Sequence, residues 1–183
     1  MEIDTPNLIM TQITEGDWSL FLRLQTEKDI IELCFDAPET DEIREKFLSR
    51  LSPWQAQDSE WLTLVIVNKS TGEQCGITGF VIENGVAEVG YMLLPEFHGN
   101  GIGTESLRAV IDWATQQHHI AHYQAVVTAG NIASECVLKK CGFELKEIVP
   151  DAYQIGSSLY DDHIYRFTKA PIPQPISQLH PIV

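Results

Sequence analysis

The chain has 183 residues, 44% hydrophobic and 21% charged, which is ordinary for a single globular domain with its own core. Its net charge of −14 argues against direct binding of nucleic acid, because phosphate contacts need clustered Lys and Arg. No apolar run approaches the ~20 residues of a membrane span, and the acidic start "MEIDTPNLIM" is unlike a signal peptide. We expect a cytoplasmic protein. The acidic surplus favours a cationic partner, or simply keeps the protein soluble.

The cysteine and histidine patterns predict no metal site. Cys34, Cys75, Cys136 and Cys141 form no Cys-x-x-Cys pair, and free thiols are expected without a secretory context. The run "HHIAH" (118–122) straddles the expected end of a helix and the start of a strand. Histidine is favourable near a helix C-terminus without any metal.

The N-terminal third reads as one strand followed by two helices. A strand is predicted over 8–13, and Thr14 with Asp17 resembles a capping box at the start of the first helix. The second helix is predicted over Asp41–Leu51 with Thr40 as its N-cap. Three residues at helical spacing in the first helix either pack in the core or line an acceptor cleft: Trp18, Phe21 and Leu22.

The pattern then changes to short, β-branched segments. Strands are predicted over 61–69, 75–83 and 86–94. The last two flank Asn84 and Gly85, the dipeptide most typical of a two-residue hairpin. Three consecutive antiparallel strands follow from this pattern.

The C-terminal half alternates helices and strands. After the glycines near position 100, the expected order is a helix to about Gln117, a strand over 122–129, a helix within 131–142, and strands at 143–148 and 163–169. The segment "PDAYQIGSSLYDD" between the last two strands is expected to be a loop. Its Asp161 and Asp162 either receive a cationic amine or lie in solvent.

These elements predict a mixed α/β domain over 1–169. Four prolines in 170–183 predict an extended, poorly ordered tail that contributes little to stability.

The segment "PEFHGNGIGTES" (95–106) places three glycines within five positions directly before a helical pattern. Glycine at that density weakens regular structure, so a need for bare backbone is indicated. A strand that ends in such a turn and opens a helix leaves N–H groups free at the positive end of the helix dipole. The motif indicates either a pyrophosphate site built from these N–H groups or a tight turn without a ligand.

Two other nucleotide motifs do not fit this spacing. A Walker P-loop requires a lysine after the glycines, and none follows. A dinucleotide-binding turn requires Gly-x-Gly-x-x-Gly, whereas the spacing here is Gly-x-Gly-x-Gly. The next strand also ends in "VVTAGN", without an acidic residue for a ribose.

At these residues the sequence resembles a known family. The segment "AEVGYMLLPEFHGNGIGTESLRAVIDWA" (87–114) is similar to the acetyl-CoA-binding motif of the GNAT acetyltransferases, Gln/Arg-x-x-Gly-x-Gly/Ala. The segments "NIASECVLKKCGF" (131–143) and "DDHIYRF" (161–167) resemble motifs of the branch that acetylates ribosomal-protein N-termini. The resemblance covers the chain up to about Lys169. One departure is His98, where the family usually has Gln or Arg, and we expect main-chain binding of the pyrophosphate to tolerate it.

The resemblance implies a GNAT-type fold: a mixed sheet of about seven strands, an antiparallel meander with a parallel splay between the fourth and fifth strands, and about four helices. It implies acetyl-CoA as cosubstrate. Asn131 matches the family asparagine that hydrogen-bonds the pantetheine, although it also suits a helix N-cap. The residues expected to bind acetyl-CoA are Met92, Leu93, Leu94, His98, Gly99, Asn100, Gly101, Ile102, Gly103, Thr104 and Asn131.

The implied reaction is direct attack of a neutral amine on the thioester. An N–H near Met92 or Leu93 is the expected oxyanion donor. Glu88 is the candidate general base because period two places it on the face of Met92, with an outward-facing Glu and water-relayed deprotonation as alternatives. Many family members protonate the thiolate with a tyrosine, but this chain has Leu138 there. Ser134 is the candidate acid, or else a helix-capping residue.

The resemblance therefore implies an N-acetyltransferase whose acceptor is a protein N-terminus, and the acidic surplus of the chain would suit a basic one. The alternatives are a small cationic amine, such as a polyamine or aminoglycoside, and an acetyl-CoA-binding module without catalysis. We expect a monomer or homodimer, with no nucleic-acid or membrane partner.

Overall fold

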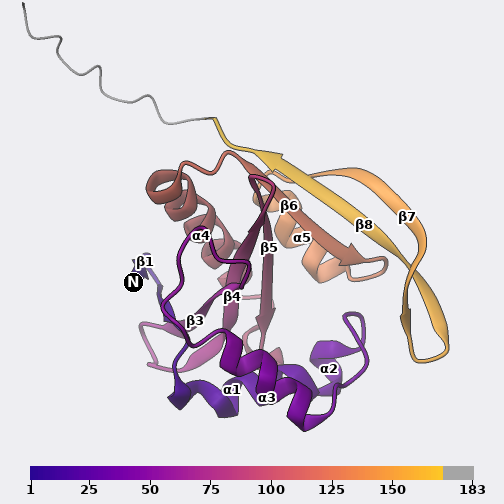
Figure 1. The fold of residues 1–183 in the computed structure, drawn as a ribbon, viewed down its shortest axis with the longest axis horizontal. Helices are drawn as coiled ribbons and strands as arrows, with labels where there is room; N and C mark the ends of the chain where they lie inside the picture. The colour runs from indigo at the N-terminus through magenta and orange to yellow at the C-terminus, as the bar shows by residue number, and fades with distance from the viewer. Residues whose placement is uncertain (171–183) are drawn as a thin grey trace, which may run out of the picture.

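The computed structural model describes residues 1–170, which form one mixed eight-stranded sheet with helices on both faces (Figure 1). The strands are β1 (Glu2–Asp4), β2 (Leu8–Gln12), β3 (Leu62–Asn68), β4 (Gln74–Glu83), β5 (Val86–Leu93), β6 (His122–Thr128), β7 (Glu144–Ile155) and β8 (Ser158–Thr168). The helices are α1 (Trp18–Thr26), α2 (Lys28–Ile31), α3 (Thr40–Ser49), α4 (Ile102–His118) and α5 (Ile132–Lys140), with 3-10 turns η1 (Glu15–Asp17) and η2 (Pro95–Phe97). The strand order is β1-β2-β3-β4-β5-β6-β8-β7.

The predicted fold class is confirmed, with one strand more than expected. The three-residue strand β1 pairs with β2 and adds an edge that was too short to predict. The hairpin between β4 and β5 is present, and both of its turn residues, Asn84 and Gly85, have the positive φ of a type I′ turn. The capping box of Thr14 and Asp17 is also present.

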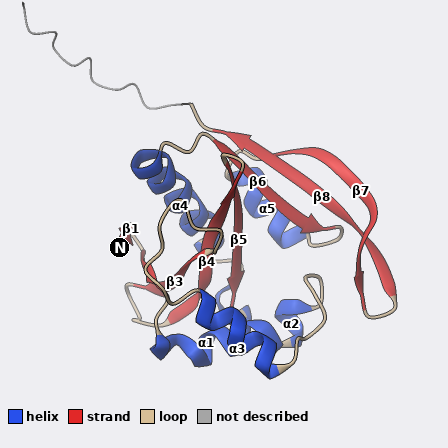
Figure 2. Cartoon of the chain, viewed as in Figure 1, coloured by secondary structure: helices blue, strands red, loops and turns tan. Residues whose placement is uncertain are grey.

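Two expectations about individual elements are wrong. Helix α3 begins at Thr40, and its N-cap is Glu39, which forms a capping box with Glu42. The expected loop 150–162 is mostly strand, because β7 and β8 continue as one long hairpin that projects beyond the helices (Figure 2). Register shifts absorb the residues that suggested a break: Pro150 and Asp151 lie in an irregularity between Val149 and Tyr153.

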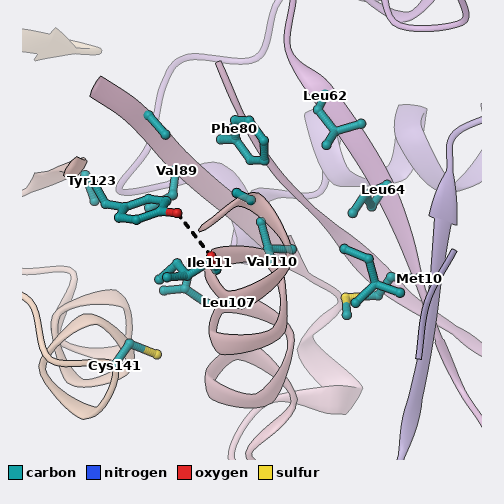
Figure 3. Packing of buried hydrophobic residues seen from close by; sticks show 14 of the residues in the cluster. Met10, Leu62, Leu64, Phe80, Val89, Leu107, Val110, Ile111, Tyr123 and Cys141 are labelled. Atoms are coloured by element: carbon teal, nitrogen blue, oxygen red, sulfur yellow. Dashed lines mark hydrogen bonds between the residues drawn. The ribbon is translucent and has the colours of Figure 1, made fainter. Parts of the chain in front are cut away.

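Two hydrophobic clusters hold the layers together. Helices α4 and α5 pack on one face of the sheet, where Leu107, Val110 and Ile111 lie against strand residues (Figure 3). The hydroxyl of Tyr123 donates a hydrogen bond to the Ile111 carbonyl at 3.1 Å and so ties β6 to α4. Helices α1 and α3 pack on the other face, over Ile77 of β4.

The sheet opens between its two parallel strands. Strands β5 and β6 pair only where Val86–Glu88 lies beside His122–Gln124. Beyond these residues the strands diverge, as Figure 1 shows. The opening connects the sheet face covered by α4 and α5 with the face covered by α1 and α3. The candidate site lies at this opening.

Within residues 1–170, no helix is both long and apolar enough to cross a membrane. The predicted tail lies outside the described residues, apart from Ala170.

Candidate active site

A cleft of about 560 Å³ lies where the carboxyl end of β5 meets the start of α4 and the start of α5. Most of the residues predicted to bind a cosubstrate line it: Met92, Leu93, His98, Gly99, Gly101, Ile102, Gly103, Thr104 and Asn131. Leu94 and Asn100 do not. The Leu94 side chain is buried in the core against α1 and α3, and Asn100 is an exposed turn residue.

The glycine turn presents bare backbone to this cleft. Gly99 and Gly101 have φ values of 78° and 80°, in the left-handed region that favours glycine, and a Cβ on either would meet no protein atom within 4 Å. Gly101 is the N-cap of α4. In the described part of the chain, the six N–H groups from Gly99 to Thr104 have no hydrogen-bond acceptor. They form a cluster of donors at the positive end of a 17-residue helix, which suits an anion.

Gly103 has a different role from its two neighbours. A Cβ there would lie 3.4 Å from the Val137 side chain and 3.5 Å from the Leu93 side chain. A Cβ at Gly103 would therefore make ordinary contacts with α5 and β5. This contrasts with Gly99 and Gly101, which open toward the cleft.

The end of β5 offers further main-chain groups. The N–H of Leu94, directly after β5, donates to the carbonyl of Cys75 in the neighbouring strand β4 at 2.9 Å. Because alternate residues of an antiparallel strand point to the same neighbour, the Met92 N–H also faces β4, whereas the Leu93 N–H and carbonyl face the opening. The His98 ring donates from Nε2 to the Leu93 carbonyl at 3.0 Å, which holds the turn against the strand.

A second cavity, of about 370 Å³, fills the opening between β5 and β6. Tyr91, Cys34, Asn131 and Ser134 line both this cavity and the cleft, so the two spaces adjoin. On its far side the cavity is lined from the long hairpin by Tyr153 and Asp162. A ligand in the cleft thus has access through the sheet to the face that carries α1 and α3.

Residues 7–144 match the acetyltransferase (GNAT) domain family. The chain belongs to the GNAT acetyltransferases. A relative from Bacillus subtilis (strain 168), an uncharacterized N-acetyltransferase named YoaA, is 25% identical over 172 residues, covering 91% of this chain and 96% of that protein.

Two solved structures show the same fold at low identity. An acetyltransferase from Salmonella typhimurium, described as modifying the N-terminal serine of ribosomal protein L7/L12, has a TM-score of 0.77 at 20% identity and covers 93% of this chain and 100% of its own. A spermidine N-acetyltransferase from Vibrio cholerae, in complex with CoA and spermine, has a TM-score of 0.78 at 16% identity and covers 91% and 98%.

This GNAT chain is an acetyl-CoA-dependent N-acetyltransferase, and the cleft fits the chemistry of that cosubstrate. The unbonded N–H groups at the start of α4 suit the pyrophosphate, and the open space beside Gly99 and Gly101 lets it approach. The match to the acetyltransferase family sets aside the alternative of a binding module without catalysis. Leu138, which suggested it, lies in the core with 1% of its surface exposed.

The GNAT asparagine position caps a helix in this chain. The Asn131 Oδ1 accepts the main-chain N–H of Ser134 at 3.2 Å, at the start of α5. Its side chain also lines the cleft, so the predicted contact with pantetheine is compatible with capping.

Glu88 lies on the sheet face away from α4 and α5. The β4–β5 register places it opposite Val81 and on the same face as Met92, four residues or about 13 Å along the strand. The Gln124 amide donates to its carboxylate at 3.5 Å. Glu88 lines neither the cleft nor the cavity in the opening, so proton transfer from an amine near the thioester would need a water molecule or a bound acceptor between them.

Tyr91 is a functional candidate that sequence reasoning missed. Its hydroxyl donates to the Ser134 carbonyl at 3.0 Å, and burial raises the pKa of the phenol, which stays protonated at neutral pH. Period two from Glu88 places Tyr91 on the opposite face, toward the cleft, and this signal was available in the sequence. The Ser134 hydroxyl has no hydrogen-bond partner within residues 1–170.

The other candidates have structural surroundings. Phe21 of α1 is fully buried in the hydrophobic cluster between α1, α3 and the sheet, and Trp18 and Leu22 pack against this cluster. None of the three side chains lines the cleft. Asp162 faces the opening, and burial raises the pKa of its carboxyl, an effect that His163 opposes. No three His, Cys, Asp or Glu side chains gather as a metal site in residues 1–170.

Proposed function

We propose that this GNAT enzyme acetylates the N-terminal amine of a protein. The observation that carries the proposal is the opening between β5 and β6, which joins the cleft to the opposite face of the sheet. The hairpin of β7 and β8 bounds it, and the Gly156 N–H near the hairpin tip donates to Asp36, which follows α2, at 2.9 Å. A narrow passage bounded in this way suits a slender, extended chain end.

The fold neighbours support this choice of acceptor. They include ribosomal-protein acetyltransferases from Salmonella typhimurium and Vibrio fischeri. The Asn-x-x-Ser form of the segment that begins at Asn131 supports it independently.

In this proposal the N–H groups from Gly99 to Thr104 hold the pyrophosphate, and Asn131 holds the pantetheine. The Leu93 N–H is the oxyanion donor, because it faces the opening while the Met92 N–H faces β4. Glu88 removes the proton from the amine through water. The thiolate takes its proton from Ser134 or Tyr91, two hydroxyl-bearing residues that line both spaces.

A second acceptor class is favoured by Asp162. This carboxyl faces the opening and would attract a cationic amine, as would the charge of −14. One of the fold neighbours is a spermidine acetyltransferase.

An acceptor panel separates the two classes. Peptides with free N-termini, the same peptides with blocked N-termini, and polyamines are incubated with acetyl-CoA while CoA release is measured. We expect release only with free N-termini, and mass spectrometry should locate the acetyl group on the α-amine. Turnover confined to polyamines would overturn the proposal.

A further inference from the structure

Arg50, at the C-terminal end of α3, lines a small pocket on the sheet face that α1 and α3 cover. In the proposed function this is the face from which the acceptor enters. The pocket has a volume of about 110 Å³, and its floor includes Gly79 and Gly90, which lie opposite each other on β4 and β5. The Trp61 ring forms a wall so close that a Cβ on Gly90 would lie 3.1 Å from it. Gly90 thus makes room for the Trp61 ring, and a Cβ on Gly79 would collide with the Leu62 carbonyl of β3, so both positions require glycine.

The half-buried Arg50 guanidinium has no carboxylate in direct contact within residues 1–170, although the charge of Glu60 acts on it from beyond ion-pair distance. It donates to the Thr63 hydroxyl at 2.8 Å, and this is the one side-chain hydrogen bond of its five N–H donors within residues 1–170. Its centre lies 5.6 Å from the Trp61 ring and 5.9 Å from the Phe21 ring. No carboxylate in the described part of the chain forms an ion pair with it. Burial lowers its pKa to about 10, so it stays charged at neutral pH.

An unpaired cation at this place is unexpected in a chain with 26 acidic and 12 basic residues. Partly burying a charge without a partner is costly, and an acidic surface offers many partners. Lys46, one turn earlier on α3, repeats the pattern. Its ammonium donates to Gln25 at 3.1 Å, Gln25 donates to the Met92 sulfur at 3.3 Å, and Lys46 has no carboxylate partner within residues 1–170.

Along β5, Arg50 reaches the position of Gly90, which lies between Met92, at the end of the strand that borders the cleft, and Glu88. Arg50 bonds to Thr63, which belongs to the cross-strand row Thr63, Gly79, Gly90. The next row on the same face, two residues along β5 and about 7 Å away, contains Glu88. Arg50 therefore lies on the same face of the sheet as Glu88, and it lines one pocket together with Gly90 and Met92 of β5.

We propose that Arg50 binds an anionic oxygen group of the acceptor, a carboxylate or a phosphate, and so selects acceptors that carry this group near the amine. A guanidinium binds a carboxylate or a phosphate through two parallel, charge-assisted hydrogen bonds. An acceptor with a neutral amide in place of the anion cannot form this pair. For a peptide acceptor, which rests on the proposed function, the anion is an acidic or phosphorylated side chain near the N-terminus. For a small amine it is a carboxylate or phosphate on the same molecule.

The test compares acceptors that differ only in the anion. Two peptides share one sequence, with Glu or Gln as the second residue, and kcat/KM is measured for both. We expect the wild-type protein to prefer the Glu peptide at least about tenfold, and Arg50→Gln to bring the ratio close to one. Arg50→Lys should keep part of the preference, because it keeps the charge without the planar fork.

Arg44→Gln is the matched control. It removes a positive charge from the same helix, but Arg44 is exposed and lies over Trp18 at 4.8 Å, outside the pocket. It should leave the preference unchanged. If Arg50→Gln does not fold, the wild-type protein supplies the answer. The N-acetylated Glu peptide, a product, should inhibit at least about tenfold more tightly than its Gln counterpart, and equal inhibition would overturn the proposal.

Small amines separate this inference from the proposed function. If no peptide is acetylated, the protein-acceptor proposal fails, and β-alanine against its amide and O-phosphoethanolamine against ethanolamine decide the role of Arg50. An Arg50-dependent preference for either anionic member supports the role and identifies the anion. Equal use of both members, turnover of polycations only, or no turnover of any anionic amine would overturn it.

Discussion

Gly101 combines two constraints that a side chain would violate together. Its φ of 80° is strained for any residue with a Cβ, and that Cβ would project into the space beside the unbonded N–H groups. We expect Gly101→Val to weaken acetyl-CoA binding by more than tenfold, or about 1.4 kcal/mol, as measured by titration calorimetry.

Gly85→Val is the control that separates the effect of backbone strain from the effect of filling the space needed by acetyl-CoA. Gly85 has a φ of 79° and also no neighbour within 4 Å, but it lies in the hairpin turn, away from the cleft. It should lower stability as Gly101→Val does and leave acetyl-CoA affinity intact. An unchanged affinity in Gly101→Val would remove the glycine turn from the binding site.

Glu88 carries the prediction about proton transfer. We expect Glu88→Gln to bind acetyl-CoA normally and to lose about 10²-fold in kcat/KM at pH 7, the usual scale for a positioned base. The loss should shrink at high pH, because free amine then accumulates without help. Glu83→Gln, at the exposed end of β4, is the control. Near-normal turnover of the Glu88 variant at pH 7 would favour deprotonation by water alone.

At the scale of elements, Glu135 joins α5 to β8. The residue is 8% exposed, and its carboxylate accepts hydrogen bonds from the His163 ring at 2.9 Å, the Tyr165 hydroxyl at 3.0 Å and the Lys139 ammonium at 3.3 Å. Burial alone would raise the pKa of this carboxyl, but the hydrogen bonds together lower it. The ionised form therefore stabilises the fold above the usual pKa near 4.3, and this stabilisation is lost as pH falls through the lowered value.

Glu135→Gln should accordingly reduce the free energy of unfolding by about 1–3 kcal/mol at pH 7. The difference from wild type should shrink below about pH 4, where the wild-type carboxyl protonates. Denaturant titrations at both pH values measure this. Glu144→Gln, at an exposed site on β7 where the carboxylate pairs with Lys146, should change stability little. Equal stability of Glu135→Gln and wild type at pH 7 would contradict the assignment.

The elements that were predicted from sequence are those whose signals are local. The turn at Asn84 and Gly85 and the glycines before α4 are specified within a few residues. The outer part of the β7–β8 hairpin was missed because Pro150 signals a break, and only pairing with the partner strand shows that a register shift absorbs it. Strand β1 exists only because β2 lies beside it.

The candidate site divides in the same way. The glycine turn, Asn131 and the face of Glu88 follow from motif and period. Tyr91 follows from period two once the cleft is located. Arg50 could not be recognised, because its helical position says nothing about the three-strand row that it reaches or about the lack of an ion pair there within residues 1–170.

At the scale of the whole molecule, net charge describes the surface and not the site. The value of −14 suggested a cationic acceptor, yet the sheet face covered by α1 and α3 carries Arg50 and Lys46, neither of which forms an ion pair within residues 1–170. A few charges fixed near the reacting atoms outweigh a distant surplus, because solvent and salt screen the surface.

The brief contact between β5 and β6 has a consequence for deuterium uptake. Only three residues of each strand are paired, so beyond Glu88 every second amide of β5 has no strand to bond to. Amides at Tyr91 and Leu93 should take up deuterium quickly in the free enzyme, while those of Gly90 and Met92, bonded to β4, remain slow. With acetyl-CoA bound, the fast positions should slow. A single strand would then report occupancy of the cleft as an alternating pattern, before any acceptor has been identified.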